Sequence, residues 1–167
     1  MTENPQKNDS YYSAPREFIR LLNELSLGDK AILRRADDPQ LLAPFWQCFN
    51  PAKKLDEKLS SNICARLIPF AGVMKGQPIT DDKQILKGVG LWLRANKEKI
   101  NLRRIEGLFS SESIEELTDD LLTIAAITKD GNPEVDFGKF YWDLVNFSKQ
   151  TDRQKTLRSW AKDFFSN

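Results

Sequence analysis

Apolar side chains recur every three to four residues over most of this chain, which places them on one face of an α-helix. The first such stripe covers residues 18–25, and Ser13 with Pro15 just before it is typical of a helix start. The residues before this start are polar. We therefore predict a flexible tail over residues 1–13 and a single helical domain over residues 14–167.

A second, shorter helix is predicted over residues 26–36, SLGDKAILRRA. Ser26 and Asp29 resemble a capping box with a shortened acid. Three apolar residues of this helix are expected to point into the protein: Ile32, Leu33 and Ala36.

The segment 39–49 is strongly apolar and rich in aromatic residues, which we interpret as core rather than as a base-stacking platform. Pro44 is expected to break or kink this segment. The chain restarts at residues 50–51, and a long amphipathic helix is predicted over residues 55–68, ending at Pro69.

The stretch 72–90 contains glycines, a proline and adjacent aspartates, and it predicts a long loop. Side-chain caps are expected at Asn101, at Ser113 and Asp136, and at the pair Thr151 and Gln154. Helices are predicted over residues 89–96, 101–109, 113–128, 136–147 and 151–165.

No segment shows the sustained alternation of a β-strand. The pattern therefore predicts an all-α fold, an irregular bundle of about seven to nine helices with one long mid-chain loop at about 72–90.

The composition argues against an enzyme. The chain has no histidine, which removes histidine-based acid–base catalysis, and it has neither a glycine-rich phosphate loop nor a paired-carboxylate motif. We therefore expect no cofactor and no metal. Cys48 and Cys64 lie in apolar surroundings and are predicted to be reduced, buried thiols, with a disulfide or a catalytic nucleophile as alternatives.

The chain has no apolar run of the roughly 20 residues needed to span a membrane. Its first dozen residues lack the apolar centre of a signal peptide. A cytoplasmic protein without a membrane partner is expected.

The net charge is only +1, so any nucleic-acid binding must come from local clusters of basic residues. Arg103 and Arg104 stand in the first turn of a helix, where the macrodipole opposes them, and phosphate contacts would compensate for this. The alternative for every cluster is an ordinary solvated helix face. The candidate nucleic-acid-binding residues are Arg20; Lys30, Arg34 and Arg35; Arg103 and Arg104; and Lys155, Arg158 and Lys162.

An acidic face is predicted on the helix that follows Arg104. It should repel nucleic acid and suits contact with a basic protein surface. Its residues are Glu112, Glu115, Glu116, Asp119 and Asp120.

Three stretches in this order resemble the CasB family, the small subunits of the type I-E CRISPR surveillance complex Cascade. They are GDKAILRRA, INLRRIEGLF, and the C-terminal VDFGKFYWDLVNF with TLRSWAKDFF. The resemblance runs from about Phe18 to the C-terminus, and the stretch 72–90 carries little of it.

The resemblance implies a non-catalytic helical subunit that assembles head to tail with its copies and with the backbone and large subunits of Cascade. Such subunits help hold the guide RNA–target DNA heteroduplex and the displaced strand through basic residues. The family's basic positions match Arg34, Arg35, Arg103 and Arg104. The ridge of Lys155, Arg158 and Lys162 matches less closely, because charge varies there.

Two other functions remain open from the sequence. One is a helical protein–protein adaptor that binds no nucleic acid. The other is a small metal-dependent hydrolase, for example around Asp81 and Asp82.

Overall fold

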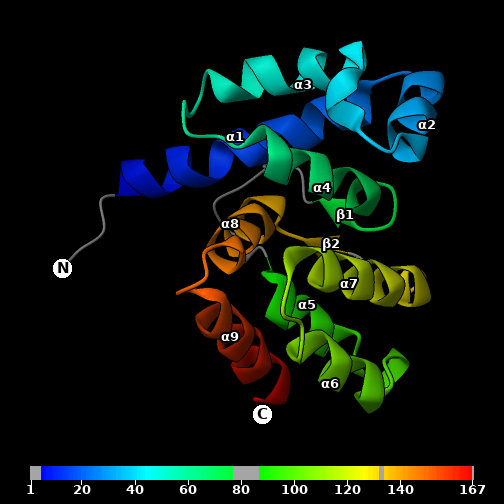
Figure 1. Ribbon diagram of the computed structural model, residues 1–167, viewed down its shortest axis with the longest axis vertical. Helices are drawn as coiled ribbons and strands as arrows, with labels where there is room; N and C mark the ends of the chain where they lie inside the picture. Colours follow the sequence, from blue (N-terminus) through cyan, green and yellow to red (C-terminus); the bar gives the residue numbers. More distant parts are fainter. Residues whose placement is uncertain (1–4, 77–86, 132–133, 167) are drawn as a thin grey trace.

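The computed structural model describes residues 5–76, 87–131 and 134–166. Within these ranges the chain forms nine α-helices and two short 3₁₀-helices (Figure 1). This confirms the predicted all-α fold and number of helices. The α-helices are α1 (Pro5–Glu24), α2 (Leu27–Arg35), α3 (Ala43–Lys53), α4 (Ser61–Ala71), α5 (Val89–Ala95), α6 (Leu102–Phe109), α7 (Ile114–Thr128), α8 (Phe137–Ser148) and α9 (Arg153–Phe165). The 3₁₀-helices are η1 (Pro39–Leu41) and η2 (Lys97–Lys99).

Two segments of two residues each, β1 (Lys75–Gly76) and β2 (Glu134–Val135), pair in parallel. Most of the predicted long loop falls on residues 77–86, outside the described part of the chain. On the far side of these residues, the Lys87 carbonyl oxygen accepts a 2.7 Å hydrogen bond from the backbone N–H of Asp136. The two ends of the stretch are thus both held beside the segment that leads into α8.

Helix α8 occupies the centre of the molecule (Figure 1). The N-terminal helices α1 to α4 lie above it in this view, and α5, α6, α7 and α9 lie below. Helix α8 packs against α1 and α4 on one side and against α9 on the other. One continuous apolar core runs through both halves and includes the buried side chains of Phe18, Phe45, Leu121, Phe140 and Trp160.

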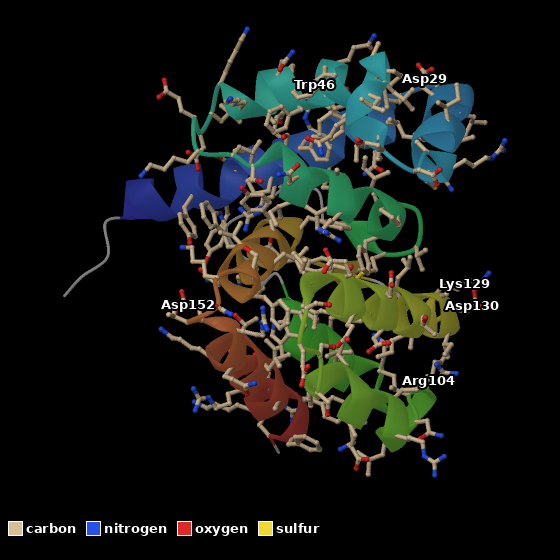
Figure 2. The ribbon with its side chains drawn as sticks, in the orientation of Figure 1. Asp29, Trp46, Arg104, Lys129, Asp130 and Asp152 are labelled. Atoms are coloured by element: carbon tan, nitrogen blue, oxygen red, sulfur yellow. The ribbon has the colours of Figure 1, made fainter. Side chains whose placement is uncertain are left out.

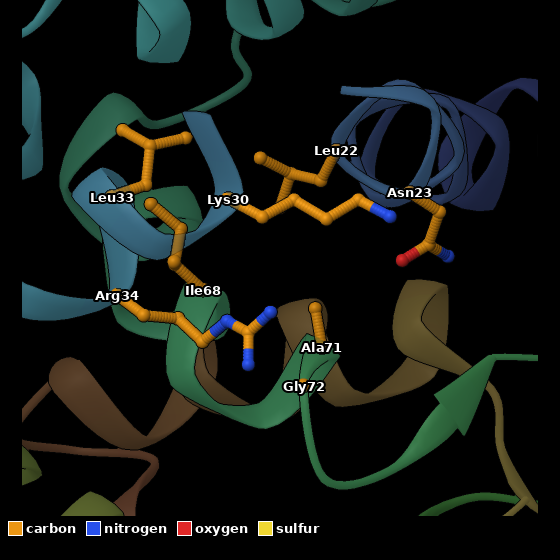
Figure 3. Close-up of a pocket in the computed structure, with 8 residues that line it drawn as sticks. All are labelled: Leu22, Asn23, Lys30, Leu33, Arg34, Ile68, Ala71 and Gly72. Carbon is orange, nitrogen blue, oxygen red and sulfur yellow. The ribbon is translucent and has the colours of Figure 1, made fainter. Parts of the chain in front are cut away.

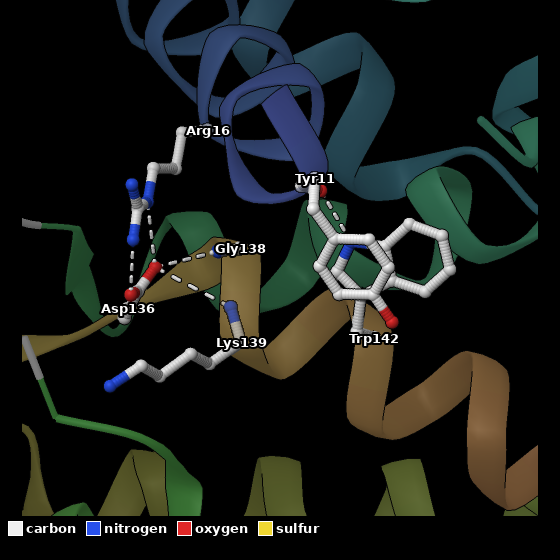
Figure 4. Close-up of polar contacts among 6 residues, drawn as sticks. All are labelled: Tyr11, Arg16, Asp136, Gly138, Lys139 and Trp142. Carbon is white, nitrogen blue, oxygen red and sulfur yellow. Dashed lines mark hydrogen bonds and ion pairs between the residues drawn. The ribbon is translucent and has the colours of Figure 1, made fainter. Parts of the chain in front are cut away.

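Helix α1 begins at Pro5, so the predicted start near Ser13 is wrong. Pro15 lies inside the helix, although its ring nitrogen cannot donate to the carbonyl of Tyr11 four residues earlier. The indole Nε1 of Trp142 donates to that carbonyl instead, at 2.5 Å (Figure 4). A side chain from α8 therefore supplies the donor that proline lacks.

The predicted break at Pro44 is confirmed: the extended backbone of Leu42 separates η1 from α3, and Pro44 stands in the first turn of α3, where a backbone N–H is not needed. Two other prolines differ from expectation. The chain does not restart at residues 50–51, since Pro51 lies inside α3. The next helix begins at Ser61 rather than near Leu55, which is exposed, and Pro69 lies inside it.

The predicted caps of α2, α6, α7 and α8 are confirmed, because Ser26, Asn101, Ser113 and Asp136 each accept a backbone N–H. The predicted opening of the last helix by Thr151 and Gln154 is wrong. Helix α9 begins at Arg153, and its N-cap residue Asp152 makes no side-chain cap bond.

Ile32 is predicted to face the interior but is exposed, and so are two other apolar residues, Leu102 of α6 and Phe165 of α9. The reason is the same for each. They lie on or at the ends of peripheral helices that pack on one side only, so a single residue per turn, such as Leu33, meets the core.

Candidate nucleic-acid interface

Helix α2 is a short helix with a side-chain cap at its N-terminus, and it carries the first group of basic residues. The hydroxyl of Ser26 accepts the backbone N–H of Asp29 at 3.1 Å, and the buried side chain of Leu33 fixes the helix to the core. Arg34 and Arg35 occupy the last turn, where the macrodipole favours positive charge. The position therefore favours both arginines, and neither forms an ion pair with a residue that the structure describes.

Lys30 and Arg34 border a small pocket between α1, α2 and the end of α4 (Figure 3). Its other walls include Asn23 and the apolar side chain of Ile68. The Arg34 side chain lies along the backbone at Gly72, where a Cβ would come within 3.2 Å of Arg34 Cδ and Nη1. Glycine at this position thus leaves room for the Arg34 side chain beside the end of α4.

Helix α6 carries the second pair, Arg103 and Arg104, in its first turn. The Asn101 side chain accepts the backbone N–H of Arg103 at 2.8 Å, while Ile105 and Leu108 are fully buried. Both arginines are exposed, and Arg104 borders a hollow that Asp120 of α7 also lines. The side chains of Arg104 and Asp120 do not form an ion pair there.

Helix α9 carries the third group, Lys155, Arg158 and Lys162, all exposed. The opposite face buries Leu157 and Trp160. The predicted basic ridge is therefore present on the surface of the protein.

Ion pairing separates the candidates into two kinds. Arg20 lies between Glu17 and Glu24 on α1, and its guanidinium pairs with both carboxylates. The other eight candidates form no ion pair with any described residue. These eight are the ones that keep their full charge available for a ligand.

Arg16 lies one turn before Arg20 on α1, but its side chain is largely buried. Its guanidinium makes a two-point contact with the carboxylate of Asp136, with Nε to Oδ1 at 3.0 Å and Nη2 to Oδ2 at 2.6 Å (Figure 4). The Asp136 side chain is 0% exposed and also accepts the N–H groups of Gly138 and Lys139. Arg16 therefore belongs to the framework and not to the basic surface.

The three basic groups do not form one patch. Helix α2 lies at the upper right of Figure 1, whereas α9 lies at the lower left. Arg104 lies at the lower right, away from α9 (Figure 2). Phe109, at the C-terminal end of α6, contacts Phe164 and Phe165 at the C-terminal end of α9. Arg103 lies at the other end of α6. A single ligand that touched all three groups would have to extend along the molecule.

The acidic face of α7 is present where the sequence placed it. Glu115 pairs with Arg66 of α4 at 2.8 Å, and the Glu116 carboxylate accepts the backbone N–H of Glu112 at 3.0 Å. Burial, with Glu116 and Asp119 nearby, raises the pKa of Asp120. All five acidic side chains of this face are exposed, so the surface is negative.

The described residues offer little for catalysis. Cys48 and Cys64 are buried free thiols, and burial raises the pKa of Cys48 to about 11 and that of Cys64 as well. Within the described ranges, no group of three or more Cys, Asp or Glu side chains could hold a metal ion. Asp81 and Asp82 lie outside those ranges. No helix of the described part is long and apolar enough to cross a membrane.

Fold and surface together define a small, all-helical protein with exposed basic groups on separate helices and one acidic face. The family of CRISPR-associated protein Cse2 matches residues 29–165, and the chain belongs to this family. Cse2 proteins are structural subunits of the type I-E Cascade complex in CRISPR defence, the same subunits as the CasB family of the sequence resemblance. No curated protein matches the chain.

Proposed function

We propose that this Cse2 subunit binds the phosphate backbone of nucleic acid within Cascade, without catalysing a reaction. It holds the guide RNA–target DNA heteroduplex and the displaced DNA strand through contacts that do not depend on sequence. The contacting residues are Lys30, Arg34 and Arg35 on α2, Arg103 and Arg104 on α6, and Lys155, Arg158 and Lys162 on α9.

The observation that carries the proposal is the pairing pattern. Arg16, Arg20 and Arg66 all have carboxylate partners, whereas none of the eight proposed residues has one among the described residues. A paired cation gains little from a phosphate, because it must first give up its partner. Arg20 is the ninth predicted residue, and we expect it to contribute least for this reason.

The chemistry suits a backbone contact. Arginine and lysine bind phosphate oxygens directly, and arginine does so with two parallel hydrogen bonds. Such contacts fix position and register and carry no sequence information, which base pairing with the guide supplies instead. The net charge of +1 keeps the long-range attraction weak, so the subunit depends on its complex for affinity.

We also propose a role in assembly for the acidic face of α7. It repels nucleic acid and docks against basic surfaces of neighbouring proteins, namely the backbone and large subunits of Cascade or another copy of this chain in a head-to-tail arrangement. The cytoplasm is where we place this assembly.

The test is a filter-binding titration of the full chain with duplex and single-stranded DNA over a range of salt. With about five phosphates neutralised, log affinity against log salt should slope near −4.5 on duplex and near −3.5 on single strands. Replacing Arg34 and Arg35 by Ala should make the duplex slope shallower by about 1.8, and replacing Arg103 and Arg104 should do the same. The quadruple variant should combine both losses.

The matched control removes two exposed lysines that are not candidates, Lys54 and Lys58. This variant loses the same charge and should keep the wild-type slope. All variants should unfold within about 0.5 kcal/mol of the wild type, because the substituted side chains are on the surface. A wild-type protein that shows no salt-dependent binding would establish the protein–protein adaptor instead.

A further inference from the structure

The segment that leads into α6 and includes its first turn is the most basic stretch of the chain. Residues 94–104 contain five cations, Arg94, Lys97, Lys99, Arg103 and Arg104, and one acid, Glu98. Only the last two cations belong to the proposed interface. Lys97 and Lys99 lie on η2, immediately before the Asn101 cap of α6.

Arg94, Lys97 and Lys99 line a cavity of about 360 Å³ between the end of α5, η2 and Gly131. Lys97 and Lys99 are exposed and have no ion-pair partner among the described residues. Arg94 donates a single hydrogen bond, from Nη1 to the hydroxyl of Ser166 at 3.2 Å. Three positive side chains thus border one cavity, and none of them forms an ion pair with a described residue.

The cavity is rigidly built. Asn96, which is 3% exposed, donates from Nδ2 to the carbonyl oxygen of Trp92 at 2.9 Å and so fixes the turn between α5 and η2. The turn after α7 packs directly on it, since a Cβ at Gly131 would lie 2.6 Å from Asn96 Oδ1 and 3.2 Å from Lys99 Cδ. The lysines are therefore carried on a preorganised turn rather than on a free loop.

The local charges favour an anion. Two features disfavour anion binding: Glu98, which also lines the cavity, and the C-terminal end of α5, which is worth about half a negative charge. Three full positive charges exceed these together. Lys129 and Asp130, the two residues that precede Gly131 in the sequence, together contribute no net charge.

We infer that Arg94, Lys97 and Lys99 form a further phosphate-binding site, continuous with Arg103 and Arg104. The segment 94–104 is then one track along which a nucleic-acid backbone runs from η2 onto the first turn of α6. This inference rests on the proposed function and adds residues that neither the periodicity nor the family resemblance assigns.

The test compares Lys97→Ala/Lys99→Ala with the control Lys54→Ala/Lys58→Ala in the salt titration with duplex and single-stranded DNA. The site predicts a slope shallower by about 1.8 on duplex and about 1.4 on a single strand, and no change for the control. Glu98→Gln should act in the opposite direction and tighten binding, which a merely destabilised variant would not do. Unchanged thermal midpoints would establish that all three variants are folded.

The outcomes separate the two claims. If Arg103→Ala/Arg104→Ala weakens binding while Lys97→Ala/Lys99→Ala matches the control, the site at η2 is wrong and the proposed function stands. If wild-type protein binds no DNA at any salt concentration, the proposed function falls and the site with it. A slope that changes as expected, together with tighter binding by Glu98→Gln, supports both.

Discussion

Trp142 donates its indole N–H to the carbonyl oxygen of Tyr11, the acceptor that Pro15 leaves without its helical partner. The two aromatic rings also stack, with centroids 3.9 Å apart and planes 9° from parallel. A proline inside α1 is thereby matched by a tryptophan on α8, and the two helices are joined at that point.

A double-mutant cycle on this contact has a defined outcome. Trp142→Phe should cost about 0.5–1.5 kcal/mol through the lost hydrogen bond, in addition to lost packing. In a Pro15→Ala background the new backbone N–H can donate to Tyr11, so the same substitution should cost less. Urea unfolding of the four proteins measures the coupling. An equal cost in both backgrounds would show that the indole N–H does not replace the missing donor.

The Arg16–Asp136 pair should dominate the attachment of α1 to the start of α8. Arg16→Ala leaves the fully buried Asp136 carboxylate without its counter-charge, and breaking such a pair typically costs about 3–5 kcal/mol. The control is Arg20→Ala on the same helix, whose exposed pairs should leave the free energy of unfolding nearly unchanged. Chemical denaturation of both variants distinguishes the buried pair from the exposed pairs.

Trp160 is 2% exposed and belongs to the core. Trp160→Ala should therefore cost about 3–5 kcal/mol. Phe165→Ala, on the same helix but with a 59% exposed ring, is the matched control and should cost much less. If Trp160→Ala left the thermal midpoint in place and weakened DNA binding, the residue would be a base-stacking residue instead.

Asp143 should make stability depend on pH. Burial raises the pKa of its carboxyl from 3.8 to about 6, although the indole N–H of Trp160, donating to Oδ2 at 2.8 Å, opposes this. The folded protein then holds a proton that the unfolded chain releases, so stability should fall as pH rises from about 4 to about 6 and change little above that.

Asp143→Asn keeps an oxygen acceptor for Trp160 and removes the charge. At pH 7 it should be more stable than wild type by about 1–3 kcal/mol, and at pH 4 or below the two should be similar. Thermal unfolding across pH 4–8 provides the comparison. A constant difference at all pH values would assign the effect to packing.

Recognition should be independent of sequence. In competition between unrelated DNA sequences at fixed salt, no sequence should be preferred by as much as about 1–3 kcal/mol, the size of one base contact. A preference of that size would mean that the protein reads bases, and the account of phosphate contacts would then be wrong.

The hydrophobic periodicity was sufficient to predict the helical fold, because most helices bury a regular stripe against one core. The effect of each proline on its helix was harder to predict. Pro44 and Pro15 have the same intrinsic effect on a backbone, but one stands in a first turn and the other is compensated by Trp142, which is 127 positions further along the chain than Pro15. Such long-range compensation leaves no local signal.

The same holds for the candidate site: ion pairs between residues close in sequence can be predicted, and those between distant residues cannot. The ion pairs of Arg20 can be predicted from the sequence, since Glu17 and Glu24 stand three and four positions away on one helix face. The ion pair of Arg16 with Asp136 joins residues 120 positions apart and cannot be predicted from the local sequence. Lys97 and Lys99 leave no such signal in the sequence, because a 3₁₀ turn of three residues is too short to show periodicity.

The two buried thiols have a practical consequence for anyone who labels the subunit. A thiolate is the reactive form of cysteine, and Cys48 and Cys64 are both held in the neutral form and shielded from reagents. A cysteine introduced at an exposed position, such as Lys97 or Arg158, would therefore be the first to react with a maleimide dye or a crosslinker near neutral pH. Fluorophores could then be attached beside each basic group with both native cysteines left in place.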